Sequence, residues 1–112
     1  MSSYRDLKVW QQSFSLAKEV YSLTSNLPET EKYGLTSQIQ RCAVSIPSNI
    51  AEGQQRNSPK EFKHFLSISR GSAAELSTQL LLAQDIYNLD CKKTIIKIEE
   101  IQKMLYSLGS KL

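Results

Sequence analysis

Apolar residues recur at steps of three and four along most of the chain, which is the spacing of one face of an α-helix. No segment shows the period-two alternation of a half-buried strand. The pattern falls into four stretches and predicts helices over about residues 6–27, 35–55, 59–87 and 90–111. Positions expected to face a core include Leu7, Trp10, Phe14, Ala17 and Tyr21, with Val9, Leu16 and Val20 widening this first stripe, then Ile39, Cys42, Ile46 and Ile50, then Leu66, Ala73, Leu76 and Leu80, and finally Ile98, Ile101 and Leu105.

Local signals mark the ends of these helices. The side chains of Asp6 and Asp90 can cap the first and the last helix, and Pro28 disfavours helix in the residue before it. The sequence from Ser58 to Glu61 is a capping box, with a capping serine, a proline in the first turn and a glutamate at the third position. The third helix therefore has the clearest predicted start.

Pro47 lies inside the second helical stretch. A proline within a helix removes one backbone hydrogen bond and clashes with the carbonyl four residues earlier, here that of Ala43, at a cost of about 3 kcal/mol. The apolar spacing continues on both sides of Pro47, so we expect a kink there and not a break.

The predicted helices are joined by short connections, which force consecutive helices to run antiparallel. Four apolar stripes of this kind bury one another best in an up-down-up-down bundle. A chain of 112 residues has the usual size of one domain. We therefore expect residues 1–112 to form a single all-α domain, an antiparallel four-helix bundle whose second helix is kinked at Pro47.

The composition is that of a globular protein, with 40% hydrophobic and 22% charged residues. The longest apolar runs are far shorter than the roughly 20 residues that span a bilayer, so no contact with a membrane is expected. The first residues lack the basic and then apolar pattern of a signal peptide. These features predict a cytoplasmic protein.

Residues that would support catalysis or metal binding are few. Cys42 and Cys91 belong to no Cys-x-x-Cys pair, and we expect both to be buried thiols. Glu61 and His64 form a single Glu-x-x-His spacing, whereas di-iron bundles use that spacing twice with further glutamates. His64 is the only histidine, and no glycine-rich phosphate loop is present. We expect no metal, no cofactor and no enzymatic activity.

The net charge of +3 is concentrated locally, because residues 54–70 hold four cations against Glu61 alone. Such a run is either a solvated helix face or a weak surface for an anionic partner. If the partner is RNA or DNA, the expected contacts are Arg56, Lys60, Lys63 and Arg70, with Tyr4, Tyr33 or Trp10 able to stack on bases where they are exposed.

A second candidate is a polar row on the second helix, formed by residues one turn apart: Arg41, Ser45, Ser48, Asn49 and Glu52. The serines and Asn49 can bond the carbonyl that Pro47 leaves unpaired, which favours a structural kink and its interface. A ligand site is the alternative. Glu75 lies among small residues of the third helix, and we expect its carboxylate to bond to the polar row of the second helix or to another subunit.

Three motifs resemble those of the 23S rRNA-intervening-sequence proteins, a bacterial family of four-helix bundles. The opening motif runs from Arg5 to Gln11, and the middle one from Tyr33 to Ile39 continues with Arg41-Cys42-Ala43-Val44-Ser45-Ile46-Pro47-Ser48-Asn49-Ile50-Ala51-Glu52-Gly53. The third includes Lys60-Glu61-Phe62, Phe65-Leu66 and residues 71–80. Together the motifs cover nearly the whole chain.

The resemblance implies a bundle that assembles into a ring-like homo-oligomer, a pentamer, without enzymatic activity. The family is also similar to the accessory protein of diversity-generating retroelements, a pentamer associated with nucleic acid. This chain, at +3, is less basic than that protein, so any basic surface is expected to be weak. We therefore expect a homo-oligomeric protein that binds RNA or DNA weakly. The alternative is a structural or protein-interaction scaffold, with a partner protein encoded nearby.

Overall fold

Four α-helices make up most of the structure, a computed structural model that describes residues 3–112. The helices are α1 (Lys8–Thr24), α2 (Leu35–Gln54), α3 (Pro59–Tyr87) and α4 (Lys92–Ser110), and the short 3-10 turns η1 (Tyr4–Asp6) and η2 (Glu29–Glu31) precede α1 and α2. The described range contains no β-strand, and none of its helices has the length and apolar character that a membrane crossing requires. The predicted all-α fold is confirmed.

Helix α3 has the bounds that the sequence predicts, and the predicted serine cap is present at its start. The hydroxyl oxygen of Ser58 accepts a hydrogen bond from the N–H of Glu61 at 3.3 Å. At the other end, Asn88 takes the left-handed backbone conformation, with φ of 58°, which closes the helix. Helix α4 begins at Lys92, slightly later than predicted, because its N-cap is Cys91 and not Asp90. Asp90 accepts a hydrogen bond from the N–H of Lys92 at 3.4 Å.

Helix α1 is shorter than predicted at both ends. Asp6 lies in η1, whose cap is Ser3, and it does not cap α1. At the other end, the side chains of Ser25 and Asn26 donate hydrogen bonds to carbonyls of the preceding turn at 2.6 Å and 3.2 Å. These bonds satisfy the last turn of α1 before the chain reaches Pro28, the residue on which the predicted end rested.

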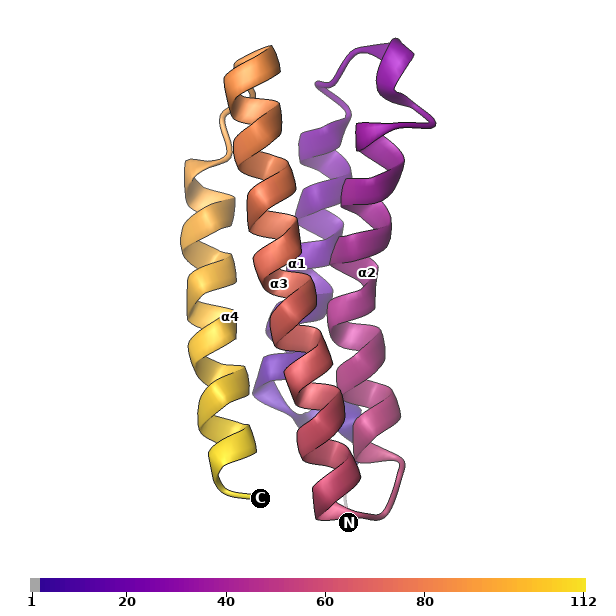
Figure 1. The fold of residues 1–112 in the computed structure, drawn as a ribbon, viewed down its shortest axis with the longest axis vertical. Helices are drawn as coiled ribbons and strands as arrows, with labels where there is room; N and C mark the ends of the chain where they lie inside the picture. Colours follow the sequence, from indigo (N-terminus) through magenta and orange to yellow (C-terminus); the bar gives the residue numbers. More distant parts are fainter. Residues whose placement is uncertain (1–2) are drawn as a thin grey trace.

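Each of the four helices packs against two others, in the cyclic order α1, α2, α3, α4. The α1–α2 and α3–α4 connections lie at one end of the molecule, and the α2–α3 connection lies at the other (Figure 1). Both α1 and α3 pack against α2 and α4, but α1 and α3 do not contact each other anywhere in the described range. These two helices therefore occupy opposite corners of a molecule about 44 Å long.

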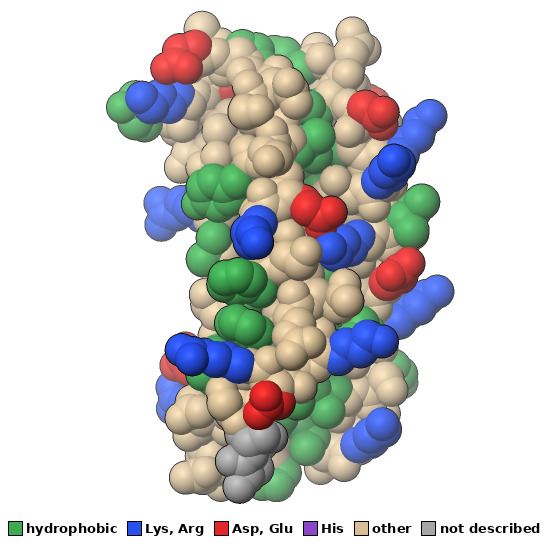
Figure 2. Space-filling model, turned by 180° about the vertical axis from the view of Figure 1, so that it is seen from behind, with side chains coloured by type: hydrophobic (Ala, Val, Ile, Leu, Met, Phe, Trp, Pro, Cys, Tyr) green, Lys and Arg blue, Asp and Glu red, His purple; other side chains and the backbone are tan. Residues whose placement is uncertain are grey.

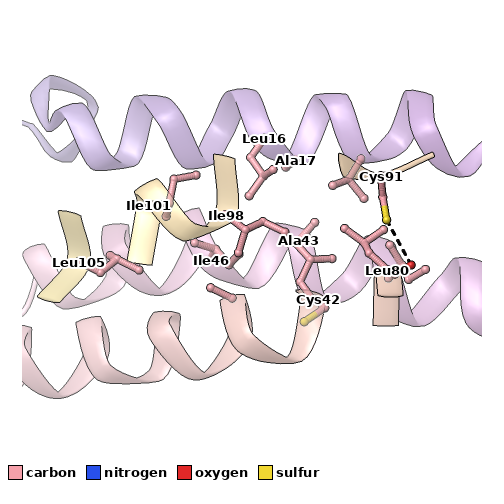
Figure 3. Packing of buried hydrophobic residues seen from close by; sticks show 14 of the residues in the cluster. Leu16, Ala17, Cys42, Ala43, Ile46, Leu80, Cys91, Ile98, Ile101 and Leu105 are labelled. Atoms are coloured by element: carbon pink, nitrogen blue, oxygen red, sulfur yellow. Dashed lines mark hydrogen bonds between the residues drawn. The ribbon is translucent and has the colours of Figure 1, made fainter. Parts of the chain in front are cut away.

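The core is built from apolar side chains of all four helices. Leu16, Ile46, Leu76 and Ile98, one from each helix, have 0% exposure. Figure 3 shows Leu16, Ile46 and Ile98 pointing into the space between the helices. Burial of each large apolar side chain contributes about 1.5–3 kcal/mol to folding. The stripes predicted for α2, α3 and α4 therefore account for most of the core.

Both cysteines are buried free thiols, as predicted. The thiol of Cys91 donates to the carbonyl of Leu80 at 3.5 Å (Figure 3) and to Gln84 at 3.3 Å. Burial raises the pKa of the Cys91 thiol, which keeps it protonated. Cys91 thus acts as a small core residue that ties the start of α4 to α3.

The buried side of α1 is narrower than its predicted stripe. Phe14 and Tyr21 are each 49% exposed, although their spacing predicted that they face the core. Val9, Leu16 and Val20, which belong to the other edge of the same predicted stripe, occupy the core. Because α1 has only α2 and α4 as neighbours, one edge of its wide apolar stripe remains uncovered.

Helix α2 continues through Pro47 without a break. Pro47 is buried, and the carbonyl of the residue before it, Ile46, accepts a hydrogen bond from the hydroxyl of Ser69 at 3.0 Å. Ser69 belongs to α3 and has 0% exposure. This buried bond fastens α2 to α3 at the level of the proline, where the helix lacks one of its own hydrogen bonds.

Gly53 allows α2 and α3 to approach closely near the end of α2. A Cβ atom at Gly53 would lie 2.6 Å from the Cβ of Phe65 and 3.1 Å from Cδ1 of Phe62. We therefore expect Gly53→Ala to lower the free energy of unfolding by about 1–3 kcal/mol, measured by urea unfolding. Gly109→Ala is the matched control, since a Cβ there meets only Cδ1 of Leu66, at an ordinary contact distance of 3.9 Å. It should instead stabilise the helix by up to about 0.5–1 kcal/mol, and equal effects of the two changes would contradict the close approach.

A hydrogen bond between Tyr87 and Glu31 ties the end of α3 to the connection before α2. The Tyr87 hydroxyl donates to Oε2 of Glu31, and the N–H of Leu35 donates to Oε1 at 3.0 Å. The bond from Tyr87, followed by that from Leu35, lowers the pKa of Glu31 below its ordinary value. The same bond to Glu31, together with burial, raises the pKa of Tyr87.

This arrangement predicts a dependence of stability on pH. A carboxylate whose pKa is lowered by folding stabilises the protein above the ordinary glutamate pKa, and its contribution is lost as the pH falls through the lowered value. We expect Glu31→Gln to lower the melting temperature at about pH 7 and to have a much smaller effect at about pH 2.5. A decrease of equal size at both pH values would contradict the role of the ionised carboxylate.

Candidate nucleic-acid interface on α3 and α4

On the surface of α3 and α4, an arginine lies over the ring of an exposed tyrosine. The guanidinium carbon of Arg70, on α3, lies 5.0 Å from the ring centre of Tyr106, on α4. The amide nitrogen of Gln102 donates to the carbonyl of Arg70 at 3.4 Å, which fixes the two helices in register. A cation over an exposed aromatic ring contributes about 0.5–1 kcal/mol. Tyr106 remains 61% exposed, so much of its surface is accessible to a ligand.

Two hollows meet at this stacked pair. One, of about 190 Å³, also includes Lys63 and Ser67 of α3, and the other, of about 540 Å³, includes Lys103 and Glu99 of α4. We call Lys63, Arg70, Lys103 and Tyr106 the α3–α4 cluster. None of its three cations makes an ion pair with any residue in the described range. The cluster therefore offers positive charge and an aromatic surface, with Glu99 as the carboxylate at its edge.

The four cations predicted from the sequence differ in their surroundings. Arg56 pairs with Glu52 at 2.7 Å and with Glu61 at 3.6 Å. The hydrogen bond to Glu52 raises the pKa of Arg56. Lys60 is exposed and is not part of either hollow, whereas Lys63 and Arg70 line the cluster. The structure thus brings two of the four predicted contacts together.

Sequence reasoning missed Lys103 and Tyr106. Both lie on α4, more than thirty positions after Arg70, and only the packing of α4 against α3 brings them beside it. The available signal was Tyr106 itself, which directly follows the buried Leu105 and so lies off the apolar stripe. Of the tyrosines and tryptophan proposed for stacking, Tyr33 is 89% exposed, whereas Tyr4 and Trp10 pack against each other at 5.3 Å.

The hydrogen bonds of the polar row lie largely within α2. The hydroxyl of Ser45 donates to the carbonyl of Cys42 at 2.6 Å, and the amide of Asn49 donates to the carbonyl of Ser45 at 2.8 Å. The predicted acceptor was the carbonyl of Ala43, which Pro47 leaves unpaired. The observed acceptors are instead the carbonyls of Cys42 and Ser45, one and two residues away from it. The remaining members, Arg41, Ser48 and Glu52, are exposed.

Glu75 does reach α2, but its partner is a cysteine and not a member of the polar row. The thiol of Cys42 lies 3.6 Å from Oε1 of Glu75 and 3.0 Å from the carbonyl of Ser72. Burial, and then the charge and hydrogen bond of Glu75, raise the pKa of the Cys42 thiol to about 12. A thiol with this pKa stays protonated at neutral pH and is a poor nucleophile.

The Glu61 and His64 pair is not assembled into a larger group of ligands. Glu61 faces Arg56, and the ring of the exposed His64 lies 5.7 Å from that of Phe65. Within residues 3–112, no three histidine, cysteine or acidic side chains lie close enough together to hold a metal ion.

Comparison with known proteins places the chain in a family. Residues 5–107 match the sequence model of the 23S rRNA-intervening sequence protein. The chain belongs to this family. The matched range of this family member includes every residue of the α3–α4 cluster. No protein with a curated function matches the sequence.

A solved structure of similar fold comes from Bacteroides thetaiotaomicron. It is a protein of unknown function from the S23 ribosomal protein family, and it is 26% identical to this family member. The similarity covers 90% of this chain and 97% of the other, with a TM-score of 0.80. The relative thus shares nearly the complete bundle.

Proposed function

We propose that this protein is a non-enzymatic, cytoplasmic homo-oligomer, a pentamer, that binds RNA or DNA through the α3–α4 cluster of each subunit. The observation that carries the proposal is a set of three cations, Lys63, Arg70 and Lys103, that have no ion-pair partners in the described range and surround the exposed Tyr106. In the proposed subunit the helices run alternately up and down, and α2 is bent at Pro47. The cluster forms where α3 and α4 lie side by side.

The chemistry of the cluster fits a nucleic-acid strand. Lysine and arginine side chains attract phosphate groups, and an exposed tyrosine ring gives a base a surface on which to stack. Stacking is worth about 1–3 kcal/mol per base and tolerates any sequence. With only three cations in each cluster, the contact that one subunit makes is weak. Repetition of the cluster around an oligomer would raise the overall affinity.

The state of the thiols supports a role without catalysis. The raised pKa values of Cys42 and Cys91 keep both thiols protonated. His64, the one histidine in the sequence, is exposed next to Phe65, and no cysteine hydrogen bond in the described range involves it. A nucleophile and its base are therefore not assembled at these residues.

A titration of fluorescently labelled single-stranded RNA and DNA tests the proposal. Anisotropy should reveal binding at micromolar protein, and the affinity should fall steeply between low and high salt because phosphate contacts release counterions. Binding that is absent, or that does not respond to salt, would eliminate the nucleic-acid function. That outcome would leave the second candidate, a structural or protein-interaction scaffold with a partner encoded nearby, which the exposed apolar side chains of α1 and α3 support.

A further inference from the structure

An apolar groove runs along the border of α1 and α2. It has a volume of about 470 Å³, and we call it the aromatic groove after Tyr4, Trp10, Phe14 and Tyr21. The rings of Trp10 and Phe14 stack at 5.0 Å, which leaves a continuous aromatic wall. Figure 2 shows hydrophobic side chains gathered along this back face of the molecule. The only charged residue that lines the groove is Lys18.

The packing of a single subunit leaves much of this apolar wall exposed to water. Phe14 and Tyr21 are each 49% exposed, and Val44, on the opposite side of the groove, is 41% exposed. An apolar groove of this kind is typical of sites that receive the apolar face of a helix.

Helix α3 carries such a face on its outer side. Its buried stripe includes Leu66, Ala73, Leu76 and Leu80, and a second stripe with steps of three and four is exposed. We call this second stripe the α3 strip. It contains Gly71, Ala74, Thr78 and Leu81, flanked by Leu82 and Ile86.

The α3 strip is exposed and nearly free of charge. Leu81, Leu82 and Ile86 are 47%, 51% and 57% exposed. The hydroxyl of Thr78 donates to the carbonyl of its own helix at Ala74, at 3.0 Å, so its hydrogen bond needs no external partner. From Gly71 to Tyr87 the only charged side chains are those of Glu75 and Asp85.

Gly71 provides a separate indication that another chain approaches this strip. A glycine inside a helix costs about 0.5–1 kcal/mol relative to alanine. At Gly71 nothing within the subunit requires that cost, because an added Cβ would meet no atom within 4 Å. The empty space beside Gly71 allows a second backbone to come close.

The groove and the strip complement each other in length and in charge. From Trp10 to Tyr21 the helix rises about 17 Å, and from Ala74 to Ile86 it rises about 18 Å. Lys18 in the groove and Asp85 beside the strip have opposite charges. Neither makes an ion pair in the described part of the chain.

We infer that the aromatic groove of one subunit receives the α3 strip of a second copy of this chain. Because α1 and α3 occupy opposite corners of the bundle, the two surfaces of one subunit are different patches that face different directions. Such contacts join subunits head to tail, and they close into a ring or continue as a filament. The inference rests on the proposed homo-oligomer and names the surfaces that build it.

Mixing two variants tests this pairing. Phe14→Glu with Tyr21→Glu disables the groove, and Leu82→Glu with Ile86→Glu disables the strip; all four positions are exposed, and circular dichroism checks that both variants fold. In analytical ultracentrifugation each variant alone should be monomeric. A mixture in equal amounts should form a dimer with one copy of each, because one intact groove can meet one intact strip.

The outcomes separate this inference from the proposed function. A monomeric wild-type protein would overturn both the homo-oligomer and the pairing. A wild-type oligomer that either variant leaves intact, or two monomeric variants that do not combine on mixing, would overturn the pairing alone.

A charge exchange supplies an independent check. Lys18→Glu and Asp85→Lys should each weaken the wild-type assembly, and the double variant should restore it at low salt. If the double variant regained no affinity, this would contradict a contact between Lys18 of one subunit and Asp85 of the next. Retained assembly in both single variants would contradict it as well.

Discussion

Replacement of Ile46 by alanine is expected to lower the free energy of unfolding by about 2–5 kcal/mol. Ile46 has 0% exposure, and its backbone carbonyl receives the bond from Ser69 of α3. Removal of its side chain leaves a cavity at the level of Pro47, where α2 already lacks a hydrogen bond and is least able to collapse into the space.

The measurement is urea unfolding followed by circular dichroism, with Ile96→Ala as the matched control. Ile96 lies on α4, is 56% exposed and belongs to none of the surfaces described above, so its truncation should change the stability by less than about 0.5 kcal/mol. Similar losses from the two substitutions would contradict the assignment of the buried face of α2.

Simultaneous replacement of Lys63, Arg70 and Lys103 by alanine is expected to weaken nucleic-acid binding by at least about tenfold at low salt. The logarithmic dependence of affinity on salt should also become shallower by about 2, since each lost phosphate contact to a single strand removes about 0.7 from the slope. The readout is the anisotropy of labelled single-stranded RNA at several salt concentrations.

The control removes the same charge elsewhere. Lys32, Lys92 and Lys93 are exposed and lie outside the α3–α4 cluster, so their joint replacement by alanine should alter binding much less. An equal loss in both triple variants would mean that net charge, and not the cluster, governs binding. Tyr106→Ala should reduce affinity more than Tyr106→Phe, because phenylalanine keeps a ring on which a base can stack.

Much of the bundle could be predicted from local sequence, most accurately where strong end signals were present. The capping serine at Ser58 marked the start of α3 correctly. The end of α1 was wrong because it was placed by Pro28 alone, while Ser25 and Asn26 close the last turn earlier. The spacing of apolar residues does not show where polar side chains bond the last carbonyls of a helix and end it.

The surfaces were harder to predict than the core. A helical stripe shows which residues are apolar but not how many of them the neighbours can cover, so Phe14 and Tyr21 were wrongly expected to be buried. The basic run drew attention to Lys63 and Arg70, which line one hollow with Tyr106. Their companion Tyr106 depended on the register of α3 against α4, which no local pattern contains.

The proposed interface can be tested most directly by photo-crosslinking. The protein would be mixed at low salt with a single-stranded RNA that contains 4-thiouridine, and the complex would be irradiated. Mass spectrometry would then identify the crosslinked peptides. The α3–α4 cluster predicts crosslinks at Tyr106 and its neighbours on α3, which disappear at high salt. Crosslinks confined to Tyr33, or to Tyr4 and Trp10, would show that the RNA binds elsewhere and would contradict the proposed site.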